Sequence, residues 1–332
     1  MIRELELLGF KSFKSNILEI KPFTLLTGLN SSGKSSVIQA LLMAGKAADG
    51  NNFLLDDHGT IKELTNTYEK SFCIGISDKN QHGMKLYGHD DVSNVDYGPQ
   101  RMVMPSIYYS EAGRHGSKSS IKVFNNSSEM DSKGGNLLKC IDTFADAEIR
   151  RELWHPDTQG ATLLFNLKAW LNIISPSVDF KYSLQRFSDQ SFSYFDDHRA
   201  TNVGFGLSYT LPVIALLLRA SLDQNSLVLL ENPEAHLHPK GQTEMGKFIA
   251  TCADCGVNVV VETHSDHLFD GIRLYTKKNP EFAKKFISYW FELDKEKNTK
   301  IENVLIDSDG RISNYAPKGF FDQFELNALE LL

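Results

Sequence analysis

The sequence predicts an α/β fold with a parallel-sheet core, an antiparallel β lobe and a helical lobe, and two observations support this prediction. The first is the order of elements near the N-terminus: an apolar run at 17–27, a glycine-rich loop from Gly28, and a segment whose apolar residues fall at helical spacing. The second is a pair of uninterrupted, β-branched runs at 226–231 and 257–263, which are typical of buried parallel strands. A chain of 332 residues is long enough for one large domain or for two lobes that share a core.

The other segments follow from the same periodicities. Residues 3–8 alternate and predict a strand, and three short β-like runs within 50–125 (SFCIGIS, GMKLYG and MPSIYYS) predict a small antiparallel sheet. Residues 130–195 and 207–222 predict helices, and the chain alternates again before a short final helix, FELNALELL. No heptad pattern persists, so we expect no long coiled-coil arm. The expected segments are an N-terminal lobe (1–125), a helical insert (126–198), a core segment (199–300) and a C-terminal segment (301–332).

Composition and charge argue against several classes of protein. A net charge of −7 argues against a dedicated DNA-wrapping protein, which would be basic overall. No apolar run approaches membrane-spanning length and the N-terminus lacks a signal-peptide core, so we expect a cytoplasmic protein without membrane association. A local basic stripe offers a route to DNA, although a solvated helix face is the favoured interpretation. The residues of this stripe are Arg273, Lys277, Lys278, Lys284 and Lys285.

The four cysteines do not form a disulfide framework in a chain of this length. Cys252 and Cys255 form an isolated C-x-x-C. A zinc site would need a second pair of ligands, for which His264 and His267 are available. We favour a helix end at TCADCG with one sulfur facing the core.

The strongest signal for chemistry is the loop from Gly28 to Ser35, GLNSSGKS, which matches G-x-x-x-x-G-K-[ST] in full. Its glycines let successive backbone N–H groups point toward phosphate oxygens, and the following helix adds its positive dipole end. Lys34 is expected to reach the β- and γ-phosphates of ATP, and Ser35 to bind Mg²⁺. The predicted phosphate-contacting residues are Gly28, Asn30, Ser31, Ser32, Gly33, Lys34, Ser35 and Ser36.

An apolar strand that ends in carboxylates, LVLLENPE, lies much further along the chain. Glu231 fits the Walker B position, where an acid holds Mg²⁺ directly or through water, although most such enzymes have aspartate there. Glu234 is the candidate general base that polarises the attacking water. His236 and His238 form an H-x-H pair, which fits a loop after Walker B better than it fits a metal phosphoesterase.

Two further segments complete the candidate site. His264, in ETHS after the next strand, is expected to sense the γ-phosphate or to stabilise charge that develops on it. Gly204, Gly206 and Ser208 lead into an apolar helix, and exposed N–H groups with a hydroxyl at a helix start form an anion site. The Walker A loop already serves the phosphates of its own subunit. We therefore expect this second anion site, the signature, to cap the γ-phosphate held by a partner subunit.

In this order, Walker A, the signature, ENPEAHLHP and ETHSDH resemble the ABC-type ATPase heads of the SMC, RecF and OLD families. The chain is similar in particular to standalone bacterial AAA ATP-binding proteins, often defence-associated, through LLGFKSFKSN, LLTGLNSSGKSS and YAPKGFFDQF. The tyrosine-rich strand and A-E-R tripeptide of that group stand here as IYYSEAGR. This departs from the pattern, so no nucleotide role is assigned to Arg114. The resemblance implies a P-loop NTPase fold, an ABC-ATPase-like head with a RecA-like core.

The resemblance also implies a function. It implies an ATP- and Mg²⁺-dependent ATPase that closes head to head as a homodimer or higher oligomer, with slow, partner-gated turnover. OLD nucleases carry a further catalytic domain that we do not expect here, so a partner effector such as a nuclease is expected to cut any DNA bound by the assembly. We expect the helical insert and the GFFDQ segment, including Phe320 and Phe321, to serve partners.

Two other functions remain open. One is a scaffold that ATP locks without hydrolysis, and the other is a RecF-like DNA-repair clamp that acts without an effector. Intact Glu234 and His264 favour hydrolysis over the scaffold. A transporter ATPase is disfavoured because the signature is not LSGGQ-like.

Overall fold

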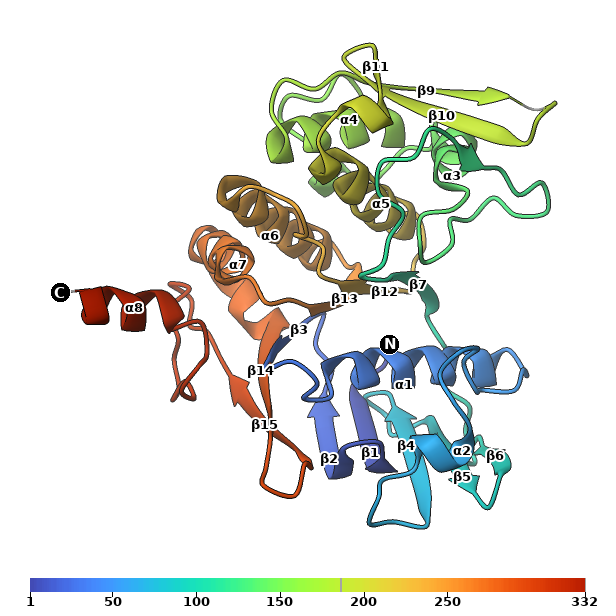
Figure 1. Cartoon of the computed structure of the whole chain (residues 1–332), viewed down its shortest axis with the longest axis vertical. Helices are drawn as coiled ribbons and strands as arrows, with labels where there is room; N and C mark the ends of the chain where they lie inside the picture. The colour runs from blue at the N-terminus through green and yellow to red at the C-terminus, as the bar shows by residue number, and fades with distance from the viewer. Residues whose placement is uncertain (186, 332) are drawn as a thin grey trace. The chain divides into compact units, whose positions relative to one another are not determined.

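The chain is described by a computed structural model, which covers residues 1–185 and 187–331 and forms two compact units. Unit 1 consists of Met1–Ile107, Phe286–Asp307 and Ile312–Leu332, and unit 2 of Tyr108–Lys285 and Ser308–Arg311. Both ends of the chain therefore build unit 1, whereas an uninterrupted middle segment builds most of unit 2 (Figure 1). The four-segment division expected from the sequence stays a prediction. Within the described ranges, no helix is both long and apolar enough to cross a membrane.

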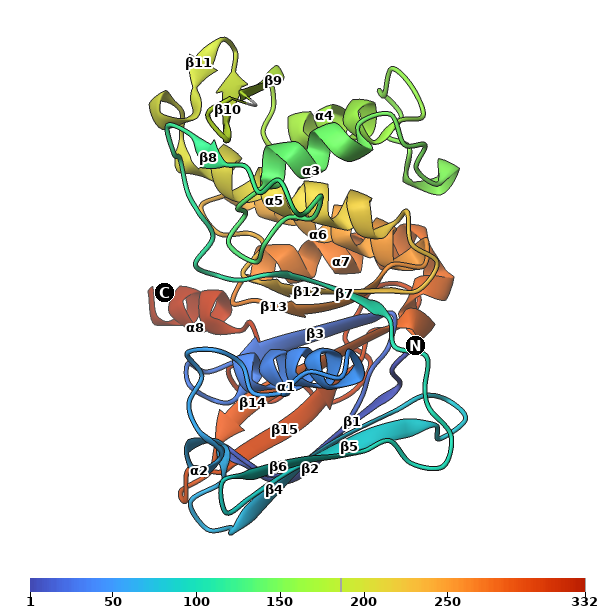
Figure 2. The same cartoon turned by 90° about the vertical axis from the view of Figure 1, so that its right-hand side faces the viewer.

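Unit 1 contains a five-stranded antiparallel sheet in the order β2-β1-β4-β5-β6. Its strands are β1 (Glu4–Phe10), β2 (Phe13–Glu19), β4 (Ser71–Ser77), β5 (Gly83–His89) and β6 (Val92–Asp96). Leu5 and Leu7 pair with Ile76 and Ile74 and are fully buried, so these two leucines share the buried face of the sheet. The helix α1 (Lys34–Ala48) contacts β4 and β5, and the short α2 (Ile61–Leu64) contacts β5 (Figure 2).

A second group of strands in unit 1 joins the two ends of the chain. β3 (Phe23–Gly28) is parallel to β14 (Phe286–Leu293), and β14 is antiparallel to β15 (Thr299–Val304). Phenylalanines begin both parallel strands, and the rings of Phe23 and Phe286 lie 5.5 Å apart, centroid to centroid. The last helix, α8 (Gln323–Leu331), also belongs to this unit.

Unit 2 is built on β12 (Ser226–Glu231) and β13 (Asn258–Glu262), which are parallel and in register, with Glu231 opposite Glu262. β7 (Ser106–Ser110) lies next to β12. The helices α6 (Pro239–Asp254) and α7 (Asp266–Lys278) follow the two parallel strands and pack against each other. The residues after β12 and β13 therefore leave the same edge of the sheet, where polar side chains of α/β proteins bind ligands.

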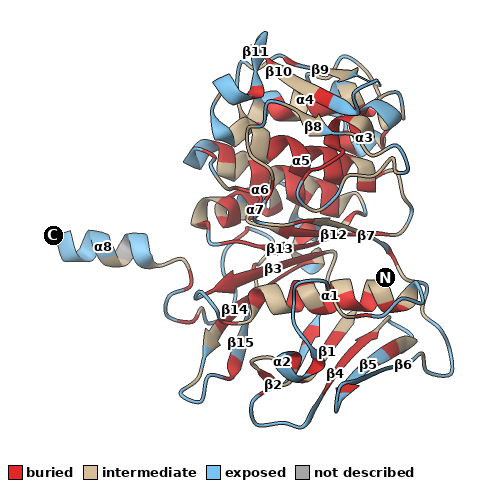
Figure 3. Ribbon diagram, turned by 45° about the vertical axis from the view of Figure 1, so that its right-hand side comes forward, coloured by how far each residue is buried: buried red, intermediate tan, exposed pale blue. Residues whose placement is uncertain are grey.

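The rest of unit 2 contains the helices α3 (Leu137–Phe144), α4 (Leu163–Ile174) and α5 (Phe205–Ala220). α5 is buried along most of its length after its first turn (Figure 3). A hairpin of β9 (Phe180–Gln185) and β10 (Gln190–Phe195) is extended by β8 (Ile121–Lys122) and β11 (His198–Arg199). Short 3₁₀ segments are η1 (Arg151–Leu153), η2 (Ala200–Asn202) and η3 (Pro280–Lys285).

The predicted α/β fold is confirmed, and two local expectations are wrong. The run MPSIYYS does not belong to the antiparallel sheet, because β7 lies beside β12 instead. The segment expected to be a helical insert also contains the β9–β10 hairpin, in which Phe180 pairs with Phe195. Local periodicity identified the short β-like run but not its neighbour, and the alternation in the hairpin was overlooked between two strong helical patterns.

Candidate active site

The Walker A loop joins β3 to α1 within unit 1, in the strand–loop–helix order that the sequence predicts. Gly28 has a φ of 136°, and a Cβ there would lie 2.2 Å from the carbonyl oxygen of Phe291. Gly33 has a φ of 109°, and its Cβ would lie 2.7 Å from the Oγ1 of Thr299. Both positions therefore require glycine, which produces a tightly curled loop against β14 and β15.

Hydrogen bonds to Thr299 help to fix this loop. The Thr299 hydroxyl donates to the carbonyl oxygen of Ser32 at 2.8 Å and lies 2.7 Å from the hydroxyl oxygen of Ser12. The Ser32 hydroxyl in turn donates to the carbonyl of Leu29 at 2.7 Å. Thr299 was not among the predicted site residues, because nothing in the local sequence links it to a loop 267 positions away.

Lys34 is only 3% exposed, and its ammonium group lies within the loop. Its Nζ donates to the carbonyl oxygens of Gly28 and Leu29 at 3.2 and 2.8 Å. Asn30 and Ser31 are exposed, whereas Ser35 and Ser36 are half-buried at the start of α1. A glycine loop curled this tightly, with a buried lysine and a serine at the helix start, fits a phosphate group and its Mg²⁺.

Glu231, the last residue of β12, is oriented by two donors from unit 2. The Tyr109 hydroxyl donates to its Oε1 and the backbone N–H of Ala112 to its Oε2, both at 3.0 Å. Burial and the nearby Glu231 carboxylate raise the pKa of Tyr109, so the phenol stays a neutral donor at physiological pH. Tyr109 and Ala112 were not predicted, although both lie in the tyrosine-rich segment that the sequence singled out. The role of Glu231 as a Mg²⁺ ligand stays a prediction.

Glu234 lies in the turn after β12 and is 6% exposed. Its Oε1 accepts a hydrogen bond of 2.6 Å from the Thr263 hydroxyl, whereas Oε2 has no hydrogen-bond partner among the described residues. Burial raises the pKa of Glu234, against the opposing effects of the Thr263 hydrogen bond and the Arg114 charge. A buried carboxylate with an elevated pKa and one open oxygen is suited to accept a proton from water.

His264 follows β13 and is exposed, while its neighbour Thr263 is fully buried and holds Glu234. The backbone N–H of Ser265 donates to the Thr263 hydroxyl at 3.0 Å, which fixes the turn that presents His264. Unit 2 therefore brings Glu231, Glu234 and the His264 turn to the carboxyl ends of adjacent strands.

The signature forms the exposed start of α5. Gly204 is its N-cap, and nothing lies within 4 Å of the position where a Cβ would stand. A Cβ at Gly206 would lie 3.0 Å from the carbonyl oxygen of His236, so this second glycine permits close packing. The Ser208 hydroxyl lies 3.1 Å from that of Ser117, and Phe205 is 59% exposed.

Several weaker sequence signals have structural explanations. Cys252 is buried in α6 and Cys255 caps its end, which confirms the helix-end interpretation. The His238 side chain caps the start of α6 by accepting from the Lys240 N–H at 3.3 Å, and the His236 ring packs on an aromatic residue of α5. No group of three or more His, Cys, Asp and Glu residues able to hold a metal occurs in the ranges that the structure describes.

The basic stripe is largely ion-paired. Arg273 bonds to Asp270 at 2.8 Å, Lys284 to Glu281 at 2.6 Å, and Lys285 to Asp254 at 2.7 Å. These are pairs on the surface of unit 2, which supports the interpretation as a solvated face.

Phe320 contradicts the expectation that the GFFDQ segment presents both phenylalanines to a partner. It is 4% exposed, and its ring lies 6.2 Å from that of Trp290 on β14, centroid to centroid. Gly319 has a φ of 94°, and a Cβ there would lie 2.9 Å from the Trp290 ring. The segment makes a tight turn that buries Phe320 in unit 1, so this residue is part of the core.

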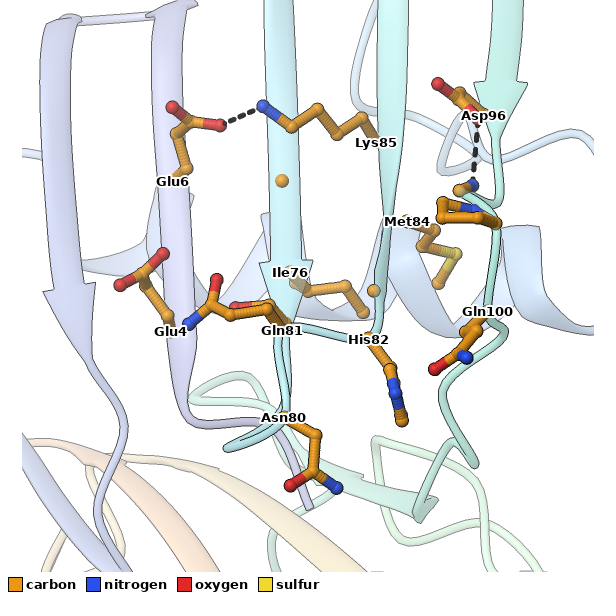
Figure 4. Close-up of a pocket in the computed structure, with 15 residues that line it drawn as sticks. Glu4, Glu6, Ile76, Asn80, Gln81, His82, Met84, Lys85, Asp96 and Gln100 are labelled. Carbon is orange, nitrogen blue, oxygen red and sulfur yellow. Dashed lines mark hydrogen bonds and ion pairs between the residues drawn. The ribbon is translucent and has the colours of Figure 1, made fainter.

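A hollow of about 490 Å³ opens on the antiparallel sheet of unit 1 (Figure 4). Glu6 and Lys85 bridge the hollow with a bond of 2.8 Å over Gly75, and Asp96 accepts from the backbone N–H of Gly98. None of its lining residues is a predicted site residue. The hollow therefore adds nothing to the candidate active site.

Three solved structures share the fold over nearly the whole chain. An SMC head bound to the C-winged helix domain of ScpA matches with a TM-score of 0.59 at 14% identity, covering 92% of this chain and 97% of that chain. The SMC head domain from Thermotoga maritima gives 0.52 at 12% identity over 92% and 99%. The Smc head domain with an extended coiled coil, bound to the C-terminal domain of ScpA and derived from Pyrococcus furiosus, gives 0.57 at 12% over 99% and 98%. The fold is therefore that of a P-loop NTPase head of the SMC type.

A comparison of the sequence with models of protein families shows the family of this chain. The model of the AAA ATPase domain matches residues 1–159 and 148–269, which is more than half of the chain, so the chain belongs to this family. The model of a protein of unknown function, DUF3696, matches residues 283–331, which include the GFFDQ segment. No curated protein matches the sequence.

Proposed function

We propose that this protein binds and hydrolyses ATP in a head-to-head dimer and that the ATP-bound dimer switches an effector protein. The observation that carries the proposal is the exposed first turn of α5, with open space around Gly204 and the Ser208 hydroxyl beside it. A helix start with free space in front of it suits an anionic group from another molecule. The γ-phosphate held by the Walker A loop of a second subunit is the anion that we propose.

In the proposed reaction, water attacks the γ-phosphorus, the bond to the ADP oxygen breaks, and Glu234 accepts the proton of the water. Lys34 would hold the β- and γ-phosphates, and His264 would stabilise charge on the γ-phosphate. Ser35 and Glu231 would hold Mg²⁺, which neutralises phosphate charge when it is bound. The open Oε2 of Glu234 supports hydrolysis over a scaffold that only binds ATP.

The effector is proposed from the resemblance to defence-associated ATP-binding proteins. A nuclease is the proposed class, with DNA held through the assembly in anti-phage defence or DNA maintenance. A RecF-like clamp without an effector is the alternative. Purification of the native protein with its bound proteins, followed by mass spectrometry, separates the two: a stoichiometric nuclease supports the switch, and the protein alone on DNA supports the clamp.

The dimer is tested with mixed subunits. Mixing Lys34→Ala with Ser208→Arg subunits should restore ATPase activity, because one composite site then has an intact Walker A loop and an intact signature. The matched control mixes wild type with a subunit that carries both substitutions. A site built across two subunits leaves no intact site in that heterodimer, whereas a site within one subunit leaves one. The heterodimers are therefore purified through two different affinity tags before assay, and activity in the control heterodimer but not in the first heterodimer would contradict the proposal.

A further inference from the structure

Arg114 has an unusual environment for an arginine in unit 2. It is 2% exposed, and burial lowers the pKa of its guanidinium to about 10. Nη1 donates to the carbonyl oxygens of Glu111 and Glu231 at 2.9 and 2.7 Å, and Nη2 donates to that of Asn232 at 2.8 Å. Its Nε has no hydrogen-bond partner among the described residues. All of its hydrogen bonds go to neutral carbonyl groups, while the nearby carboxylates of Glu234 and Glu231 favour its charge and offset part of the cost of burying a cation.

The carbonyl groups that Arg114 holds define the path of the chain between the two acids of the candidate site. Glu231 ends β12, and Asn232 takes a left-handed conformation with a φ of 43°. The Asn232 N–H donates to the carbonyl oxygen of Glu262 on β13 at 2.8 Å, and Glu234 follows in the same turn. Arg114 therefore fixes the carbonyl groups of Glu231 and Asn232, three and two residues before Glu234, and with them the start of the turn that carries this acid.

The other face of the same guanidinium contacts the signature helix. Its central carbon lies 5.5 Å from the centroid of the Tyr209 ring, a cation–π contact one residue after Ser208. The Tyr209 ring also packs on His236, in the loop after Glu234, at 4.5 Å between centroids. The Ser117 hydroxyl also lies within hydrogen-bonding distance of the Ser208 hydroxyl. The segment that carries Arg114 therefore runs alongside the first turn of α5.

We infer that Arg114 is a positioning residue that couples the signature helix to Glu234. When a partner's phosphate binds at the start of α5, Tyr209 and Arg114 transmit the conformational change of that helix turn to the turn after β12, which carries Glu234. Glu234 is then correctly placed only in the closed dimer. The inference rests on the proposed function, and it predicts that hydrolysis, rather than binding, depends on Arg114.

The test compares Arg114→Ala, Arg114→Lys and Tyr209→Leu with wild type. We expect Arg114→Ala to lower kcat by about 10²-fold, the usual cost of a misplaced catalytic group, while KM for ATP and ATP-dependent dimerisation stay near the wild-type values. Lysine keeps the charge but cannot reach all three carbonyl groups, so Arg114→Lys should lose most of the same activity. Tyr209→Leu leaves the carbonyl contacts in place and should lower kcat without altering nucleotide affinity.

Added guanidinium at millimolar concentration should restore part of the Arg114→Ala activity, and methylammonium should not. With kcat expressed per folded protein, measured by circular dichroism, a merely structural arginine would give neither a loss of kcat nor this chemical rescue. The inference is overturned if kcat stays at the wild-type value, or if the loss of kcat is no larger than the loss of folded protein. If Arg114→Ala does not fold, the measurement of kcat and nucleotide affinity on Tyr209→Leu tests the inference instead. Failure of wild-type protein to dimerise with ATP would instead refute the proposed function.

Discussion

At the scale of single residues, the Lys34 ammonium is held inside the Walker A loop by two backbone carbonyl groups. It is thus already buried and in place before a phosphate arrives, and phosphate oxygens can replace these two carbonyl acceptors. Hydrogen bonds between a cation and an anion are stronger than those to a carbonyl group, so the exchange favours the nucleotide.

Lys34→Ala should therefore lower the affinity for ATP with Mg²⁺ by about 10²-fold or more, since it removes the principal cation of the loop. Lys46→Ala is the matched control, because Lys46 lies in the last turn of the same helix and its side chain bonds to the Leu54 carbonyl oxygen, away from the loop. Titration calorimetry measures both affinities. Undiminished binding by the Lys34 variant would refute the phosphate-loop assignment.

The elevated pKa of Glu234 has a measurable effect on stability. A carboxyl group whose folded pKa lies above its unfolded value favours folding while it is protonated, and this contribution is lost as pH rises through the window between the two values. At neutral pH the buried charge therefore destabilises the unliganded protein. Glu234→Gln should raise Tm at pH 8, by about 2–4 °C for each kcal/mol of destabilisation that it removes, and the gain should shrink as pH falls toward 5. Thermal unfolding at several pH values tests this, and a gain independent of pH would contradict the elevated pKa.

At the scale of elements, the C-terminal segment is joined to unit 1 by the turn around Phe320. Phe320 packs on Trp290 of β14, while the following helix α8 exposes its apolar residues, with Phe324 at 78% and Leu329 at 70%. The turn and the helix of one segment therefore contribute differently to stability.

Phe320→Ala should reduce the free energy of unfolding by about 3–5 kcal/mol, as expected for a large aromatic residue removed from a core. The exposed Phe324→Ala should change it by less than about 0.5 kcal/mol. Urea unfolding of both variants gives the comparison. Equal effects would show that Phe320 is not a core residue in solution.

At the scale of the whole molecule, the proposed switch depends on how long ATP stays intact between two subunits. Glu234→Gln should slow hydrolysis by about 10²–10⁴-fold, because the amide keeps the size of the acid but cannot accept the proton of the water. The variant should migrate as a dimer with ATP and return to monomer when nucleotide is removed. Size-exclusion chromatography with light scattering, beside a phosphate-release assay, measures both effects.

Glu231→Gln is the control for this variant. It should mainly raise the Mg²⁺ concentration needed for activity, because the amide binds a divalent cation weakly and its single oxygen can accept from only one of Tyr109 and Ala112. Wild-type turnover by Glu234→Gln would show that another group activates the water.

Much of the fold follows from local sequence. The glycines of the Walker A loop, the β-branched runs of β12 and β13 and the apolar face of α1 are recorded in short segments, so their strand and helix types could be predicted. The neighbours of a strand depend on contacts between distant segments. For this reason β7 was assigned to the wrong sheet, and Phe320 was expected on the surface.

The residues of the candidate site are likewise of two kinds, those that belong to a local motif and those that only the fold brings into place. Lys34, Glu231 and Glu234 belong to short motifs with fixed spacing, and such motifs can be recognised in one sequence. Tyr109, Thr263 and Thr299 act by holding those motifs in place, and each does so with a single hydroxyl group. A hydroxyl that meets its partner only in the folded chain has no distinctive local pattern.

Because β14 and β15 form the wall behind Gly28 and Gly33, a growing chain has no complete cradle for ATP until these late strands leave the ribosome. Ser32 and Thr299 are 267 positions apart. At about 5–20 residues per second, roughly 13–53 s separate the synthesis of the loop from that of its support. ATP can therefore stabilise only chains that have grown past β15, and truncated products that end before β14 would lack nucleotide protection and remain open to proteolysis.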